Sequence, residues 1–70
     1  MSINYQKRLD LASRIAHFFA KNKDTVDLVD CSWLIGMVCD TTMSDAELLK
    51  EIEYTKENFP EYSPILNWEQ

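Results

Sequence analysis

Residues 3–21, INYQKRLDLASRIAHFFAK, carry the sequence pattern that decides the fold. At about 100° per residue, the apolar side chains of this segment gather on roughly half of a helical wheel. Asp10 and Arg14 lie on the opposite side, four residues apart, at a spacing that favours ion pairing. We therefore predict an amphipathic helix over residues 3–21, with an apolar face wide enough to contact more than one neighbour. The predicted face comprises Tyr5, Leu9, Leu11, Ala12, Ile15, Ala16, Phe18 and Phe19.

Residues 26–40 form the second predicted segment, and their apolar side chains point almost all round a helix axis. A strand over residues 33–39 is the alternative, because tryptophan, isoleucine and valine favour strands. However, the sequence offers no second convincing strand, and an unpaired strand would leave its backbone groups unsatisfied. We therefore predict a helix that is capped by Asp24 or Thr25 and buried on most sides, with Trp33 inside.

The third predicted helix, residues 45–59, has a clear start and a clear end in the sequence. Ser44 and Glu47 have the spacing of a capping box, in which each side chain bonds to the backbone of the other. Pro60 disfavours helical geometry at the residue before it, so the helix should end at Phe59. The stripe expected to face inward comprises Leu48, Leu49, Ile52 and Phe59.

The tail, residues 60–70, is rich in large apolar side chains. Ser63 as a cap and Pro64 at the first position are suited to start a short helical turn. A small domain must use most of its apolar groups, so we expect the tail to fold back over the core. The alternative is that the tail anchors a partner or a second copy. The side chains in question are Tyr62, Ile65, Leu66 and Trp68.

Length and composition fit one compact acidic domain. The chain has 70 residues, of which 46% are hydrophobic, with one glycine, two prolines and a net charge of −5. This composition is too apolar, and too poor in glycine and proline, for a disordered segment. We therefore predict an all-α three-helix bundle with a short docked C-terminal tail, in a single domain over residues 1–70. Homodimerisation is one way to complete the bundle, because a monomer this small has few surfaces that can cover the second helix.

The sequence also predicts a cytoplasmic protein that contacts no membrane. No stretch approaches the ~20 apolar residues of a membrane-spanning helix, and residues 1–20 lack the pattern of a signal peptide. Cys31 and Cys39 are eight residues apart, which places their Cα atoms about 12 Å apart on a continuous helix. That separation is too large for a disulfide, so we expect two reduced thiols, as in a cytosolic protein.

Charge is divided unevenly along the chain. Residues 1–23 hold five basic groups and one acid, whereas residues 24–70 hold eleven acids and two lysines. The outer face of the third helix gathers acids around an aromatic residue, which is typical of a surface that meets a basic partner. The alternative is that these acids only keep the domain in solution. The candidate partner-binding residues are Glu47, Glu51, Glu53, Tyr54 and Glu57, with Asp27 and Asp30 from the second segment and Tyr62 and Trp68 from the tail.

The sequence offers little for catalysis or cofactor binding. His17 lies four residues from Ser13 on the polar face of the first predicted helix, where no oxyanion donors are expected. Cys31, Cys39 and one distant histidine lack the spacing of a zinc site. Gly36, the only glycine, excludes a glycine-rich phosphate loop and is expected to let another helix approach closely. We therefore predict no enzyme activity, no metal and no cofactor.

These observations favour a non-enzymatic binding protein. In size and acidity the chain is similar to small phage-encoded inhibitors, anti-CRISPR proteins among them, and to small antitoxins and adaptors; the likeness is one of composition and not of motif. We predict an inhibitor or adaptor that blocks a basic surface of a larger protein, such as one that holds nucleic acid. An acidic chain should not bind nucleic acid directly. The alternative is a self-associating structural domain.

Overall fold

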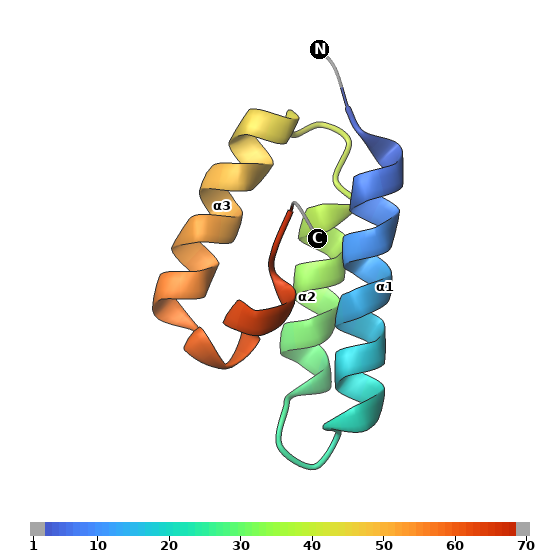
Figure 1. The fold of residues 1–70 in the computed structure, drawn as a ribbon, viewed down its shortest axis with the longest axis vertical. Coiled ribbons are helices and arrows are strands. Elements are labelled where there is room, and N and C mark those ends of the chain that lie inside the picture. Colours follow the sequence, from blue (N-terminus) through green and yellow to red (C-terminus); the bar gives the residue numbers. More distant parts are fainter. Residues whose placement is uncertain (1–2, 69–70) are drawn as a thin grey trace.

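Four helical elements follow one another in the computed structural model, which describes residues 3–68 (Figure 1). They are helix α1 (Tyr5–Lys21), helix α2 (Leu28–Val38), helix α3 (Asp45–Asn58) and the 3-10 helix η1 (Pro60–Ile65). Helix α1 packs along α2, while α3 packs against η1, which in turn contacts α1. In Figure 1 the C-terminal segment lies between α2 and α3. The predicted all-α three-helix bundle with a docked tail is confirmed.

The core forms where the three main helices meet the tail. Tyr62 and Leu66 are 2% and 0% exposed, so the tail supplies two of the buried side chains. Each large apolar side chain that is fully buried contributes about 1.5–3 kcal/mol, which explains why so short a domain folds its tail back. The buried apolar residues are Leu11, Ile15, Cys31, Leu34, Met37, Val38, Leu48, Ile52, Tyr62 and Leu66.

The second helix is shorter at both ends than the predicted residues 26–40. Its N-cap is Asp27, whose carboxylate accepts a hydrogen bond of 2.8 Å from the backbone N–H two residues on. The expected caps, Asp24 and Thr25, are therefore wrong. They lie instead in a turn, in which the N–H groups of Thr25 and Val26 donate to the carbonyl of Asn22.

One face of α2 is open to solvent, so the prediction that this helix is buried on most sides is wrong. Leu28, Val29 and Trp33 are 61%, 72% and 54% exposed. Gly36 lies on the same face, since it follows Val29 and Trp33 at spacings of seven and three residues. A Cβ atom at Gly36 would meet no atom within 4 Å, so no described helix approaches there. The rest of the described chain therefore leaves part of the apolar surface of α2 uncovered.

The third helix starts where predicted and ends one residue earlier. The Glu47 N–H donates to the Ser44 hydroxyl at 3.2 Å, and the Ser44 N–H donates to the Glu47 carboxylate at 2.9 Å. Phe59 was expected on the inward stripe, but its φ of −133° takes it out of the helix and leaves it 43% exposed. Helix η1 begins at Pro60 rather than at Pro64, because a proline fits the first turn of a helix.

The buried face of α1 is rotated from the predicted one towards its basic side. Tyr5 and Leu9 are both 61% exposed, whereas Arg8 is 2% exposed. Arg8 precedes the buried Leu11 and Ile15 by three and seven residues, and such spacings place side chains on one stripe of a helix. The spacing of Arg8 from Leu11 and Ile15 therefore indicated that Arg8 lies on the buried stripe. A pattern that counts only apolar side chains does not detect it.

The Arg8 guanidinium ties α1 to the end of α2 and the start of α3. Its Nη2 donates to Oδ1 of Asp45 at 2.9 Å and to the carbonyl of Met43 at 2.7 Å. Its Nη1 donates to the carbonyls of Asp40 at 2.7 Å and Val38 at 3.5 Å. A buried charge is tolerated when it is paired and hydrogen-bonded, and here a carboxylate and three carbonyls meet that need.

Two further expectations concern the cysteines and the membrane. Both thiols are free, with Cys31 buried and Cys39 exposed. The absence of a disulfide between them is therefore confirmed. Among residues 3–68, no helix has the length and apolar character that crossing a membrane requires.

Candidate functional site

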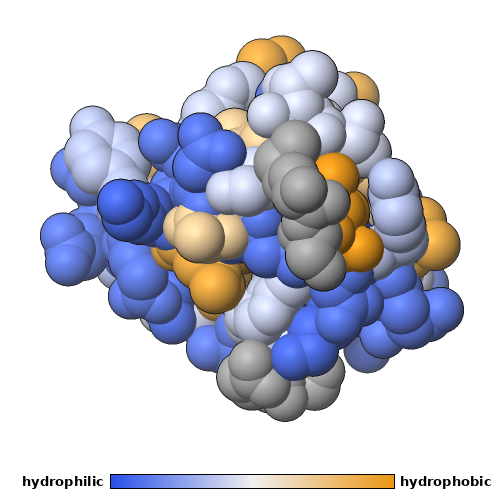
Figure 2. All heavy atoms as spheres, turned by 90° about the horizontal axis from the view of Figure 1, so that it is seen from above, coloured by the Kyte–Doolittle hydropathy of each residue, from blue (hydrophilic) through white to orange (hydrophobic). Residues whose placement is uncertain are grey.

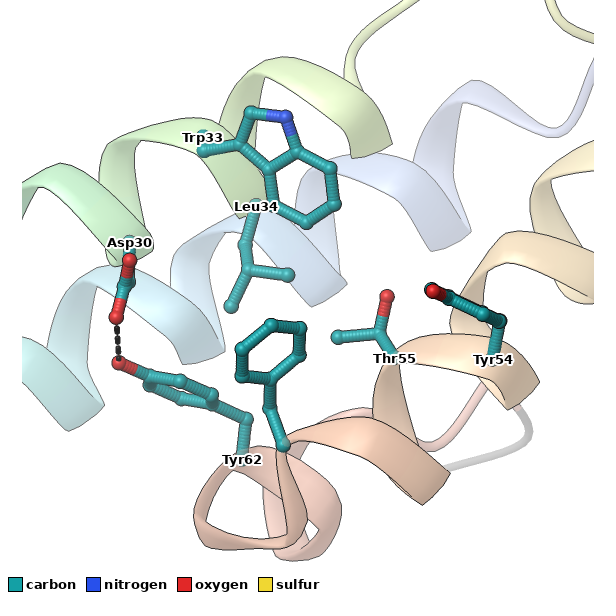
Figure 3. Close-up of a pocket in the computed structure, with 7 residues that line it drawn as sticks. Asp30, Trp33, Leu34, Tyr54, Thr55 and Tyr62 are labelled. Atoms are coloured by element: carbon teal, nitrogen blue, oxygen red, sulfur yellow. Dashed lines mark hydrogen bonds between the residues drawn. The ribbon is translucent and has the colours of Figure 1, made fainter.

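An open groove of about 310 Å³ lies between α2 and α3, with η1 at one end. Figure 3 shows Trp33 of α2 and Tyr54 of α3 on opposite walls, and Asp30 next to Tyr62 at the other end of the view. The groove exists because the tail, and not a direct helix–helix contact, fills the space between α2 and α3. Its lining residues are Asp30, Trp33, Leu34, Tyr54, Thr55, Phe59 and Tyr62.

The walls of this groove are unusually aromatic and unusually exposed. Trp33, Tyr54 and Phe59 are 54%, 61% and 43% exposed, although each ring carries a large apolar surface. Single exposed apolar residues are ordinary on a protein surface, but rings gathered around one groove mark an interaction site. Tryptophan and tyrosine are also the side chains that most often dominate binding interfaces.

One carboxylate is fixed at the end of the groove by a tyrosine. The Tyr62 hydroxyl donates to Oδ2 of Asp30 at 3.3 Å. Burial first, and then the negative charge of Asp30, raise the pKa of Tyr62 to about 12. The phenol therefore keeps its proton at neutral pH and remains a donor to Asp30. The Tyr62 ring is itself held by an edge-on contact with Phe18, at 6.0 Å between ring centroids.

The four glutamates of α3 are all exposed, but they do not form one row. At 100° per residue, Glu47 and Glu51 fall on the same flank as Tyr54, which lines the groove. Glu53 and Glu57 fall on the opposite flank, and Glu53 lies 3.5 Å from Lys56. The acidic face therefore comprises two rows, of which only the first borders the groove.

Besides Glu47, which is part of the capping box of α3, three of the predicted partner-binding residues serve the fold itself. Asp27 caps α2. Tyr62 is a core residue, so the prediction that it lies on an exposed binding surface is corrected by its burial. Trp68 packs against the core, and its ring receives the ammonium of Lys7 at 5.6 Å from the ring centroid. Trp33 and Phe59 were expected inside the fold, but they line the exposed groove instead.

Three of the four basic side chains of α1 point into the fold, and one of them, Arg14, holds the tail. Arg14 donates to the carbonyl of Ile65 at 3.0 Å and to that of Asn67 at 2.9 Å. Together with Arg8 and Lys7, it directs three of the chain's seven basic side chains inward. The basic side chains that lie beside the exposed glutamates of α3 are therefore the two lysines of that helix, Lys50 and Lys56. In Figure 2, hydrophilic side chains cover much of the end seen from above, with hydrophobic groups between and beside them.

The residues considered for catalysis lie apart from the groove. Ser13 and His17 are exposed on α1, as is Asp10 on the same helix, which accepts a hydrogen bond of 3.0 Å from Gln6. Within residues 3–68, no three His, Cys, Asp or Glu side chains are arranged to hold a metal ion. What the arrangement offers chemically is recognition: aromatic surface, one fixed carboxylate and an acidic border.

Comparisons of the chain with protein-family models, with curated proteins and with solved structures find no match.

Proposed function

We propose that the protein is a small acidic, non-enzymatic binding module that acts as an inhibitor or adaptor by covering a basic surface of a larger protein. The observation that carries this proposal is the division of charge. Residues 24–70 hold eleven acids against two lysines, while the arginines of the first 23 residues face the interior. The molecule therefore presents negative charge where α3 and the groove face solvent.

The two parts of the site have different roles in this proposal. Complementary charge mainly speeds association and excludes wrong partners. Affinity comes from a few side chains that lose their water on binding, and Trp33, Tyr54 and Phe59 supply such anchors beside the acids. A partner whose basic surface normally holds nucleic acid would lose access to it by steric and electrostatic blocking. We also propose a cytoplasmic setting, which the two free thiols support.

The test begins with capture of the partner by the tagged protein and reconstitution of the purified pair. Affinity should fall at least tenfold between 50 and 500 mM salt, because exposed charges are screened within a few ångströms at high salt. Replacing Glu51, Glu53 and Glu57 with glutamine should weaken binding and flatten this salt dependence. The matched control replaces three acids outside the site, Asp10→Asn, Asp24→Asn and Glu61→Gln, and should bind as the parent does. Affinity indifferent to salt would refute the electrostatic mechanism.

A second candidate function, self-association as a structural module, is favoured by the open face of α2. Leu28, Val29 and Trp33 are apolar and exposed, and a second copy would cover them. Sedimentation equilibrium at micromolar to millimolar concentration separates the candidates. A concentration-dependent dimer that the change Val29→Glu abolishes would support self-association, and a strict monomer would exclude it.

A further inference from the structure

The groove between α2 and α3 combines aromatic walls with a carboxylate. It is lined by the rings of Trp33, Tyr54, Phe59 and Tyr62, and its only charged lining residue among those described is Asp30. Aromatic faces carry partial negative charge, so rings beside a carboxylate form a site suited to a cation. No basic side chain from the described chain lines the groove to satisfy it.

We propose that this groove binds an arginine side chain, presented by the basic surface of the partner. This inference rests on the proposed function, because it names the group of the partner that the site receives. The guanidinium would lie at the Asp30 end of the groove, and the aliphatic stem of the arginine would run between the walls formed by Trp33 and Tyr54, which Figure 3 shows on opposite sides of the groove. Its N–H groups would donate to the carboxylate of Asp30.

The carboxylate of Asp30 makes an apolar side chain an unfavourable occupant of the groove. An ionised carboxylate accepts about four hydrogen bonds, and Tyr62 supplies one of them at 3.3 Å. An apolar side chain seated in the groove would displace water from the remaining acceptor positions without replacing its hydrogen bonds. Covering a charge in this way is costly, whereas a cation that donates to it satisfies it.

The aromatic walls of the groove favour an arginine side chain over a lysine side chain. A guanidinium is planar, is weakly hydrated and stacks on aromatic rings while its edge donates to a carboxylate. A lysine ammonium is compact and strongly hydrated, so it gains less from rings on two sides. The groove volume of about 310 Å³ lies at the lower end for small-ligand sites, which suits one side chain rather than a folded segment.

The test uses a defined probe in place of the partner. N-acetyl-L-argininamide is titrated into the ¹⁵N-labelled full chain, and the indole N–H resonance of Trp33 is followed by NMR. We expect saturable shifts confined to the groove, with the lysine analogue binding at least threefold more weakly. The citrulline analogue, which has nearly the same shape but no charge, should not saturate. Equal binding of arginine and citrulline analogues would overturn the proposal.

Variants separate the carboxylate from the rings. Asp30→Asn should weaken binding about tenfold, because it removes a charge-assisted hydrogen bond. Trp33→Leu, at a position exposed enough to leave folding intact, should weaken it about threefold, and Tyr54 then reports the shifts. Asp24→Asn, the same chemical change in an exposed turn, is the matched control and should bind as the parent does. Shifts spread evenly over the acidic surface, or unchanged affinity in both groove variants, would refute the assignment.

The outcome also separates this inference from the proposed function. A complex with the partner that is sensitive to salt but unaffected by Asp30→Asn would remove the arginine site and leave the blocking mechanism standing. If the affinity for the partner did not depend on salt while N-acetyl-L-argininamide still bound in the groove, the blocking mechanism would be removed and the arginine site would stand.

Discussion

Replacing Arg8 with alanine should bring the protein close to unfolding. The change removes hydrogen bonds of 2.7–2.9 Å to Asp45, Asp40 and Met43 and leaves their acceptors without a donor. Losing one partner of a buried ion pair costs about 3–5 kcal/mol. The side chain of Asp45 is 28% exposed and can regain water, so we expect the lower end, about 3 kcal/mol. A domain of this length has a total stability of only about 4–10 kcal/mol.

Urea denaturation followed by circular dichroism at 222 nm measures this cost. A loss of about 3 kcal/mol corresponds to a fall in Tm of about 12–24 °C for a domain of this size. Lys21→Ala, which removes an exposed positive charge from the same helix, is the control and should change stability by less than about 0.5 kcal/mol. If Arg8→Ala lost less than about 1 kcal/mol, the account of Arg8 as the link between α1 and the start of α3 would be wrong.

The other predictions concern a helix, a cap and a thiol. Gly36→Ala should raise stability by about 1 kcal/mol, since a Cβ there meets no atom, and Ala16→Gly on the exposed side of α1 should lower it by about as much. Hydrogen bonds from Ser44 lower the pKa of Glu47, so the stability they provide is present above pH 4.5 and is lost as pH falls below it. The Tm of the parent minus that of Glu47→Gln, measured from pH 7 to pH 3, should therefore shrink on acidification; a constant difference would contradict this. Cys39 should react with iodoacetamide under native conditions at pH 8, whereas buried Cys31, whose pKa burial raises, should react only on unfolding. Mass spectrometry of the digested protein would show the order, and equal labelling rates would contradict it.

Local signals in the sequence predicted most of the secondary structure. The capping box at Ser44 and the stop at Pro60 fixed α3 to within one residue, because both act through neighbouring backbone groups. The start of α2 was predicted too early because only Asp24 and Thr25 were considered as caps, whereas Asp27, which is equally able to cap a helix, begins it. Wheel analysis placed α1 to within two residues but rotated its buried face, since it counted only apolar side chains and left Arg8 out.

The groove could be predicted only in part. Its acidic border and Tyr54 follow from the pattern of α3, whose outward side is readable from the sequence alone. The contribution of Trp33 and Phe59 could not be foreseen, because large aromatic residues are buried more often than exposed. Their exposure follows from the position of the tail, which occupies the space where α2 and α3 would otherwise pack. That position depends on contacts between residues as far apart as Arg14 and Asn67.

The wedge-like position of the tail also favours one order of events during folding over another. Helices α1 and α2 are neighbours in sequence and pack directly, so they can associate as soon as both have formed. Helix α3 is joined to that pair mainly through η1 and the segment after it, and it has no comparable platform until those residues arrive. Helices α1 and α2 would therefore assemble first as a helical hairpin, and α3 would pack in place only together with η1 and the segment that follows it.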